Sequence, residues 1–110
     1  MLPADPSPIV SSLSGDPDML ELVEEFVDNL RDRTRSLEVA YAANDVEELV
    51  RLAHQLKGSS GGYGFDAIGE AAGGLEQSAR AAGSVTDIAQ ELEGFIAMCR
   101  RATAEPVGQA

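Results

Sequence analysis

One long amphipathic stretch near the start of the chain limits the possible folds most strongly. Seven apolar side chains recur there at steps of three, four and seven residues: Met19, Leu22, Val23, Phe26, Leu30, Leu37 and Tyr41. This spacing puts them on one face of a single helix, which we expect to reach about Ala42. Asp16 can cap the start of this helix, Pro17 suits its first position and Asp18 complements the helix dipole. The folded part of the chain therefore begins with a long helix near Asp16.

Three further segments have the same period, with turn or capping residues at their ends. We expect a second helix from the Asn44–Asp45 turn to at least Lys57, a third from Phe65–Asp66 to Gly83 and a fourth from near Thr86–Asp87. Their inward apolar positions are Val46, Leu49, Val50, Ala53 and Leu56, then Ile68, Ala71, Ala72, Leu75 and Ala79, then Ile88, Leu92, Phe95, Ile96 and Cys99. We find no strand pattern and no sequence repeat. The sequence therefore predicts an all-α fold, an antiparallel up-down four-helix bundle.

The length of 110 residues favours one domain with a modest core. Residues 1–15 hold three prolines and several serines, so we expect a flexible lead-in there, with at most one short helical turn around Ile9 to Leu13. The bundle is then expected over residues 16–103, and a frayed tail over residues 104–110.

Composition and charge exclude several kinds of partner. The net charge is −11, and residues 1–48 contribute −9 of it from twelve acids and three bases, so the chain repels nucleic acid. The single cysteine, Cys99, allows no intrachain disulfide, and we interpret it as a small buried hydrophobe. The N-terminus has no basic region, and no apolar run reaches about 18 residues, so we expect neither a signal peptide nor a membrane span. These features favour the cytoplasm.

Most site chemistries need residues that this chain lacks. A hydrolytic triad would depend on the only histidine, His54, whose surroundings imply no nucleophile. A zinc or di-iron site would need more ligands than His54 and Cys99 supply. The segment KGSSGG starts with its lysine and follows a helix, unlike a phosphate-binding P-loop. We interpret the acids of ELVEEFVD, from Glu21 to Asp28, as a solvated helix face.

The position of His54 has two interpretations. On a helical wheel it lies on the flank of the second helix, with Lys57 and Gly58 one turn further along. In the simpler interpretation the glycines only end the helix, and His54 is an ordinary surface residue. In the other, Gly58 removes the side chain that would cover the imidazole, and Lys57 supplies a cation for a phosphoryl group on the ring. An exposed neutral imidazole is a nucleophile suited to accept such a group.

The segment AHQLKGSSGGYG, residues 53–64, is similar to the signature of histidine-containing phosphotransfer (HPt) domains. In that pattern a histidine is followed by lysine three residues later, by glycine at the fourth residue, then by small residues, and by glycine at the tenth. The matching positions here are His54, Lys57, Gly58, Ser59–Ser60 and Gly64. The segment LEQSARAAG, residues 75–83, also resembles the family's next helix, and the resemblance covers about residues 16–103.

The resemblance implies a phosphorelay carrier. His54 Nε2 would take a phosphoryl group from a phosphoaspartate of a response-regulator receiver domain, or give one to it, with Lys57 steadying the phosphoryl charge. The residues implied in access and docking are Arg51, Gln55, Gly58, Ser59, Gly62 and Gly64. The chain would need no cofactor, because the receiver would supply Mg²⁺. It would also have no ATP site and no kinase activity of its own. The expected partners are receiver domains and an upstream hybrid histidine kinase, and the expected state is a monomer.

Three alternatives stay open on the sequence. One is the phosphoacceptor domain of a chemotaxis-type histidine kinase, which differs in its phosphoryl donor. The others are a non-phosphorylated helical adaptor and a purely structural bundle, and both predict that His54 can be replaced without loss. It is also open whether Gly61 and Gly62 continue the second helix or end it.

Overall fold

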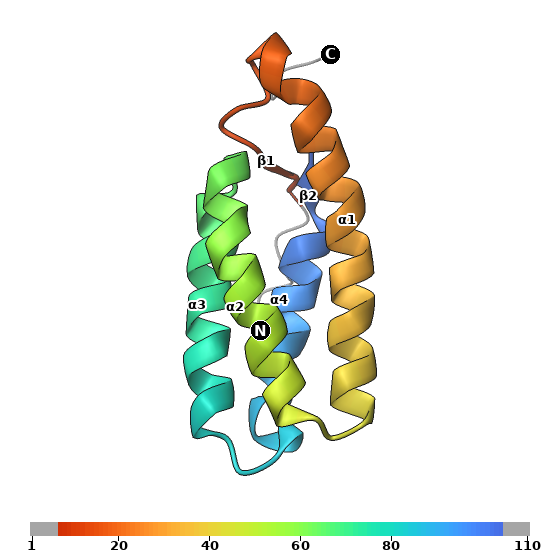
Figure 1. Cartoon of the computed structure of the whole chain (residues 1–110), viewed down its shortest axis with the longest axis vertical. Helices are drawn as coiled ribbons and strands as arrows, with labels where there is room; N and C mark the ends of the chain where they lie inside the picture. The colour runs from red at the N-terminus through yellow and green to blue at the C-terminus, as the bar shows by residue number, and fades with distance from the viewer. Residues whose placement is uncertain (1–6, 105–110) are drawn as a thin grey trace.

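Four helices form a bundle in the computed structural model, which describes residues 7–104 (Figure 1). They are α1 (Pro17–Ala42), α2 (Val46–Ser60), α3 (Asp66–Ala81) and α4 (Ala89–Arg100). Two short 3₁₀ helices are η1 (Gly61–Tyr63), which follows α2, and η2 (Val85–Ile88), which precedes α4. Consecutive helices run in opposite directions (Figure 1). The predicted all-α four-helix bundle is confirmed.

Capping residues fix the starts of α1 and α2. Asp16 Oδ1 accepts a hydrogen bond from the backbone N–H of Asp18 at 2.9 Å, and Pro17 is the first residue of α1. Asp45 Oδ1 accepts from the backbone N–H of Glu48 at 3.0 Å. Each carboxylate satisfies a donor that the first turn of a helix leaves without a partner. Both helices therefore begin where the sequence predicted.

The end of α3 differs from the prediction. The helix ends at Ala81 rather than Gly83, because Ala82 is already extended (φ −76°, ψ 140°). Gly83 donates its N–H to Asp87 Oδ2 at 2.8 Å instead. This glycine therefore belongs to the turn that starts the next helical segment.

The core gathers the inward faces of all four helices. Its largest fully buried apolar side chains are Val23, Leu30, Leu37, Leu49, Leu52, Leu56, Phe65, Ile68 and Leu75. The predicted inward positions are buried or half-buried, with one exception. Leu22 was expected to face inward and is 44% exposed. Leu52 was not in the expected set although it is buried, so the apolar face of α2 is wider than the sequence pattern indicated.

A short parallel pair of strands joins two segments that are far apart in the sequence. β1 (Ile9–Val10) pairs with β2 (Ala102–Thr103), with Ile9 opposite Ala102. The sequence has no strand pattern at either segment, because two-residue strands are too short to show an alternating pattern. The turn expected around Ile9 to Leu13 lies at residues 12–15 instead. Residues 1–6 of the expected lead-in and 105–110 of the expected tail lie outside the described residues, and both boundaries stay predictions.

Candidate functional site

His54 lies on the exposed flank of α2, beside α3. α2 turns Leu52, Ala53 and Leu56 into the core, and this leaves the His54 side chain 66% exposed. The ring is held on one side, because its Nδ1 lies 3.1 Å from Oε2 of Glu76 on α3. The histidine is thus open to a partner and still fixed in orientation.

Glu76 is a buried carboxylate with three basic neighbours. Its side chain is only 8% exposed. Arg80, one turn further along α3, donates to Oε2 from Nη2 at 2.7 Å and from Nε at 3.2 Å. Lys57 Nζ lies 3.8 Å from the other oxygen, Oε1. The hydrogen bonds from Arg80, and then from His54, lower the pKa of Glu76 despite desolvation, so the carboxylate is ionised at neutral pH.

The ionised carboxylate determines which nitrogen of His54 carries the proton. A carboxylate without a proton only accepts hydrogen bonds, so Nδ1 must donate in its contact with Glu76. In the neutral imidazole, Nε2 then has the free lone pair. Because most of the side chain is exposed, a partner can reach this atom. The geometry therefore presents Nε2 as the nucleophilic atom.

The Lys57 side chain packs against α3 at a glycine. A Cβ added at Gly73 would lie 3.4 Å from Lys57 Cδ, so the lysine stem lies close across the bare backbone of α3. The 3.8 Å between Lys57 Nζ and Glu76 Oε1 is too long for a hydrogen bond. The N–H groups of the ammonium are therefore not hydrogen-bonded to Glu76 and can donate to another anion near His54.

The flank of α2 beyond His54 is bare backbone. A Cβ added at Gly58 or Gly62 would meet no atom within 4 Å. Gly61 has helical angles (φ −62°, ψ −37°), so the helical path continues from α2 into η1. Gly61 and Gly62 therefore extend the helix by a 3₁₀ turn, which answers the question that the sequence left open. We call residues 58–62 the glycine strip.

A match to a known domain shows the family of the chain. Residues 21–105 match the family model of the Hpt domain. The chain belongs to the Hpt domain family. Hpt domains are histidine phosphotransfer modules of two-component systems, without a kinase activity of their own. No curated protein and no solved structure matches the chain.

Small residues bring α2 and α3 of this Hpt domain close together. A Cβ added at Gly69 on α3 would lie 3.6 Å from the carbonyl oxygen of Lys57 and 3.6 Å from Ser60 Cβ. Ser60 is fully buried at this contact. A larger side chain at either position would push the two helices apart. Their close approach is what puts Glu76 within hydrogen-bond distance of His54.

Glu76 and Arg80 are site residues that the sequence analysis missed. Glu76 lies four residues after Ala72 and three before Ala79, on the buried face of α3. A charged residue at such a position needs a partner, because a buried charge without one is unstable. An acid inside an apolar pattern was therefore the signal that could have indicated this residue.

Two expected docking residues of the Hpt domain, Arg51 and Gln55, lie exposed on α2 and have partners of their own. Arg51 Nε donates to Glu48 Oε1 at 2.6 Å. Gln55 Oε1 accepts from Arg33 Nη1 at 3.4 Å. The contact with Arg33 holds Gln55 towards α1, whereas Arg51 is held along α2 by Glu48.

The other two expected docking residues have different surroundings. Ser59 is half-buried, and its Oγ donates to the carbonyl oxygen of Gln55 at 3.0 Å. Gly64 has a left-handed backbone (φ +83°), and a Cβ there would collide with Ser11 and Ser12. Gly64 therefore belongs to the contact with the N-terminal segment and not to the open flank of α2.

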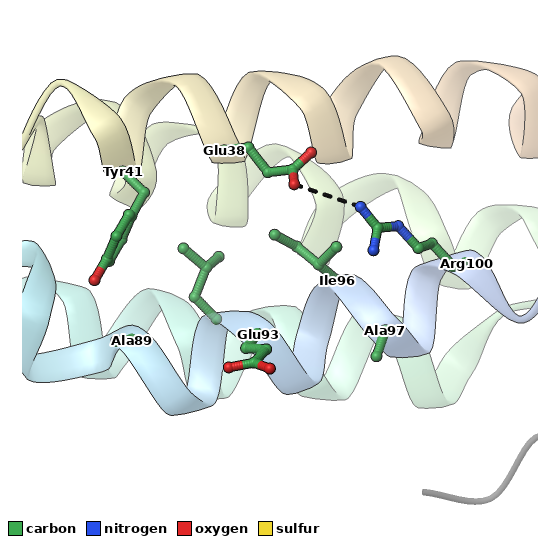
Figure 2. Close-up of a pocket in the computed structure, with 8 residues that line it drawn as sticks. Glu38, Tyr41, Ala89, Glu93, Ile96, Ala97 and Arg100 are labelled. Atoms are coloured by element: carbon green, nitrogen blue, oxygen red, sulfur yellow. Dashed lines mark hydrogen bonds and ion pairs between the residues drawn. The ribbon is translucent and has the colours of Figure 1, made fainter.

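A groove between α1 and α4 lies apart from this site (Figure 2). It has a volume of about 450 Å³ and an apolar floor that includes Leu92 and Ile96. The Glu38–Arg100 ion pair, with oxygen and nitrogen 3.4 Å apart, bridges the two helices there. No residue of α2 or α3 lines the groove, so it is not part of the His54 site.

Three further observations bound what the domain can do. Over residues 7–104, no helix has both the length and the apolar character that a membrane crossing requires. The same residues contain no group of three or more His, Cys, Asp or Glu side chains that could hold a metal ion. Cys99 is buried as expected, and burial raises the pKa of its thiol to about 12, so the thiol stays neutral.

Proposed function

We propose that this chain carries a phosphoryl group on Nε2 of His54, to or from the aspartate of response-regulator receiver domains, in a cytoplasmic phosphorelay. An upstream hybrid histidine kinase would supply the phosphoryl group, and the carrier would act as a monomer. The observation behind the proposal is an exposed imidazole bound through Nδ1 to the buried, ionised Glu76, with Lys57 beside both. A nucleophile oriented by a second group is the usual arrangement in covalent group transfer.

The transfer step follows from the position of the proton on the ring. The lone pair of His54 Nε2 attacks the phosphorus of the receiver's phosphoaspartate, in line with the acyl oxygen that leaves. The N–P bond forms, the P–O bond breaks, and the electron pair of that bond returns to the receiver's carboxylate. Nδ1 keeps its hydrogen, so the phosphorylated ring is a cation. Glu76 offsets this positive charge, and in the reverse step the ring leaves as neutral imidazole.

The charges around His54 suit a phosphorylated ring. Lys57 and Arg80 supply two positive charges and Glu76 one negative charge. A phosphoryl group adds a charge of about −2, and the protonated ring adds one positive charge, so the site becomes close to neutral. Arg80 is tied to Glu76 by two hydrogen bonds, whereas Lys57 has none to it. Lys57 is therefore the cation that would contact the phosphoryl group, while Arg80 holds Glu76.

This chain would contribute a positioned nucleophile, and the receiver the rest of the machinery. Mg²⁺ and a lysine of the receiver would neutralise the transferring group. The glycine strip would let the receiver's backbone approach α2 closely, because Gly58 and Gly62 have open space where a side chain would stand. Arg51 and Gln55, both exposed on α2, would flank the approach.

The test is transfer from a phosphorylated receiver. Wild type and His54→Gln are incubated in parallel with ³²P-labelled receiver domains, and with a histidine kinase and labelled ATP as a second donor. We expect acid-labile, alkali-stable label on wild type only, and from the receiver. Equal label on both proteins, or none on either across many receivers, contradicts the proposal. Label from a kinase domain that has no receiver, and from no receiver, would favour the phosphoacceptor domain of a chemotaxis-type kinase.

A further inference from the structure

The N-terminal segment holds the end of the site helix, although it precedes the part of the chain that matches the Hpt family. We call residues 9–14 the N-terminal clasp; the family match begins at residue 21. We propose that the clasp positions the surface that a receiver meets, with Ser11 and Gly64 as the residues through which it acts. This inference rests on the proposed function, because it concerns how the receiver reaches His54.

Hydrogen bonds attach the clasp to the turn after α2. Ser11 Oγ donates to the carbonyl oxygen of Tyr63 at 2.6 Å, and it accepts from the N–H of Leu13 at 3.0 Å. The N–H of Ser12 donates to the carbonyl oxygen of Gly64 at 3.0 Å. Ser11 is only 4% exposed. The clasp therefore satisfies two backbone acceptors of the segment in which the helical path ends.

The other end of the clasp is fixed by the strand pair. The N–H of Ile9 donates to the carbonyl oxygen of Arg101 at 2.8 Å, and β1 pairs with β2 after α4 (Figure 1). A segment bound only to η1 would move with it. Because this one is also bound beyond α4, it ties the end of α2 to the opposite side of the bundle.

The glycine strip needs such a support. Gly58, Gly61 and Gly62 fall within five residues, and glycine loses more backbone freedom in a helix than any other residue. At Gly58 and Gly62 no atom lies within 4 Å of an added Cβ, so no neighbouring group packs against these two residues on that side. Within the strip, Ser60 is buried against α3, and the strip is also held at its far end, where the N–H of Phe65 donates to the carbonyl oxygen of Ser60 at 2.9 Å. The stacking of Tyr63 on Phe26, with ring centres 4.7 Å apart, holds the same end.

Gly64 is the residue that lets the clasp approach. Its positive φ of +83° is a conformation that other residues adopt with strain. A Cβ there would also lie 2.9 Å from the backbone nitrogen of Ser12 and even closer to Ser11 Oγ. The clasp and a side chain at position 64 therefore exclude each other. This gives the last glycine of the histidine motif a role in supporting the strip.

The support matters because the strip begins one turn beyond His54. A receiver that brings its phosphoaspartate to Nε2 covers this flank of α2. If the strip were frayed, the receiver would have to order it on binding, and the conformational entropy lost in this ordering would weaken the affinity. A small donor that touches only the imidazole would not meet this requirement. Loss of the clasp should therefore weaken use of the receiver and leave a small donor unaffected.

The experiment compares Ser11→Ala with Ser12→Ala as the matched control, because Ser12 is exposed and binds Gly64 through its backbone. Amide hydrogen exchange is measured at Gly64 and Phe65. Phosphorylation is measured with a ³²P-labelled receiver over a range of concentrations, and with phosphoramidate as the small donor. For Ser11→Ala we expect exchange about tenfold faster and a KM for the receiver about tenfold higher, as the loss of one hydrogen bond implies. We expect an unchanged rate with phosphoramidate, and Ser12→Ala should match wild type in all three.

Two results overturn the inference. One is unchanged exchange at Gly64 and Phe65 in Ser11→Ala, since the clasp then does not hold the strip. The other is faster exchange with an unchanged KM for the receiver, since the strip then does not matter for the encounter. If wild type takes no label from any receiver, the proposed function itself fails. The role of the clasp in transfer then falls with it, while the exchange data still report on the clasp as a structural support.

Discussion

Two helix pairs of the bundle are each bridged by a glutamate, from Glu76 on α3 to His54 on α2 and from Glu38 on α1 to Arg100 on α4, and only the first bridge forms a site. Between α2 and α3, Glu76 is 8% exposed and accepts hydrogen bonds from both Arg80 and His54. Between α1 and α4, Glu38 is 53% exposed and meets Arg100, itself 62% exposed, at 3.4 Å. Burial with several donors fixes a carboxylate in place, whereas an exposed pair is free to separate. The buried Glu76 can therefore hold the His54 ring in one orientation, whereas the exposed Glu38 could not fix a neighbouring side chain in this way.

The distance between the helices explains the difference in burial. α3 approaches α2 through Gly69, where even one added carbon would touch Ser60 at 3.6 Å. α1 and α4 instead leave a groove of about 450 Å³ between them (Figure 2). A carboxylate at the first contact is covered by its neighbours, and one at the second stays in water.

The largest expected effect is on transfer when the buried carboxylate is neutralised. Glu76→Gln keeps the size of the side chain but no longer offsets the charge on the phosphorylated ring or fixes Nδ1 as the donor. We expect the rate of transfer from a phosphorylated receiver to fall about 10- to 100-fold, by analogy with the loss of a carboxylate that orients a metal-ligating histidine. Rapid-quench measurement with labelled receiver gives this rate.

Glu38→Gln is the matched control, because it makes the same chemical change in the exposed pair. We expect its transfer rate to stay within about twofold of wild type, since surface ion pairs contribute little. Equal losses in the two variants would mean that overall charge matters and that the contact with His54 does not. No loss in Glu76→Gln would show that His54 needs no orienting partner.

The next effect in size compares two glycines with open surroundings. Gly58 on α2 and Gly94 on α4 both have no atom within 4 Å of an added Cβ. We expect Gly58→Leu to slow transfer from a receiver about tenfold, because a new side chain would stand one turn from His54. Gly94→Leu should leave transfer unchanged. Thermal melting should show equal or higher stability in both, since each replaces a helical glycine.

This pair of variants separates access from stability. If Gly58→Leu transfers as fast as wild type, the open flank is not the approach of the receiver. If both variants are slower by the same factor, the cause lies in the helices and not in the surface beside His54.

The fold could be predicted from the sequence because each helix marks its own buried face. The period of three and four residues and the caps at Asp16 and Asp45 are local signals, and both were confirmed. Leu22 shows where such signals fail. α1 has 26 residues and the other three helices have 15, 16 and 12, so a residue on its apolar face is not certain to find a neighbour. The two-residue strands could not be found from the sequence for a related reason, because their pairing joins Ile9 to Ala102 and has no local pattern.

The site could be predicted only where it lies on one helix. The spacing of His54, Lys57 and Gly58 is a property of α2 alone, and it indicated a phosphoacceptor. Glu76 depends on how far α3 slides along α2 and on which side it faces, and neither follows from the period of either helix. The role of Gly64 depends in the same way on contact with Ser11, which lies more than fifty residues earlier. Residues that act through a neighbouring helix are therefore found from the fold, and not from the sequence pattern.

The smallest expected effect is on the pH dependence of stability, and it compares Glu76 with Glu48. Hydrogen bonding lowers the pKa of both, from Arg80 in one case and from Arg51 in the other, below the ordinary value of 4.5. Each carboxylate thus stabilises the fold above pH 4.5, and this contribution is lost as the pH falls through its lowered pKa, because the unfolded chain then binds the proton more readily. Below pH 4.5 the free energy of unfolding falls as the pH falls. We expect Glu76→Gln and Glu48→Gln each to make this slope shallower, by an amount that corresponds to at most about one bound proton.

Salt separates the two carboxylates. The Glu48–Arg51 pair is exposed on α2, with 35% and 54% of the side chains accessible, so its contribution should disappear at about 1 M salt. Glu76 is covered by α2 and α3, so its contribution should persist. Urea unfolding of both variants and wild type between pH 3 and pH 7, at low and high salt, measures this. If salt removes both contributions equally, Glu76 is as open to solvent as Glu48, and its hold on His54 is an exposed contact after all.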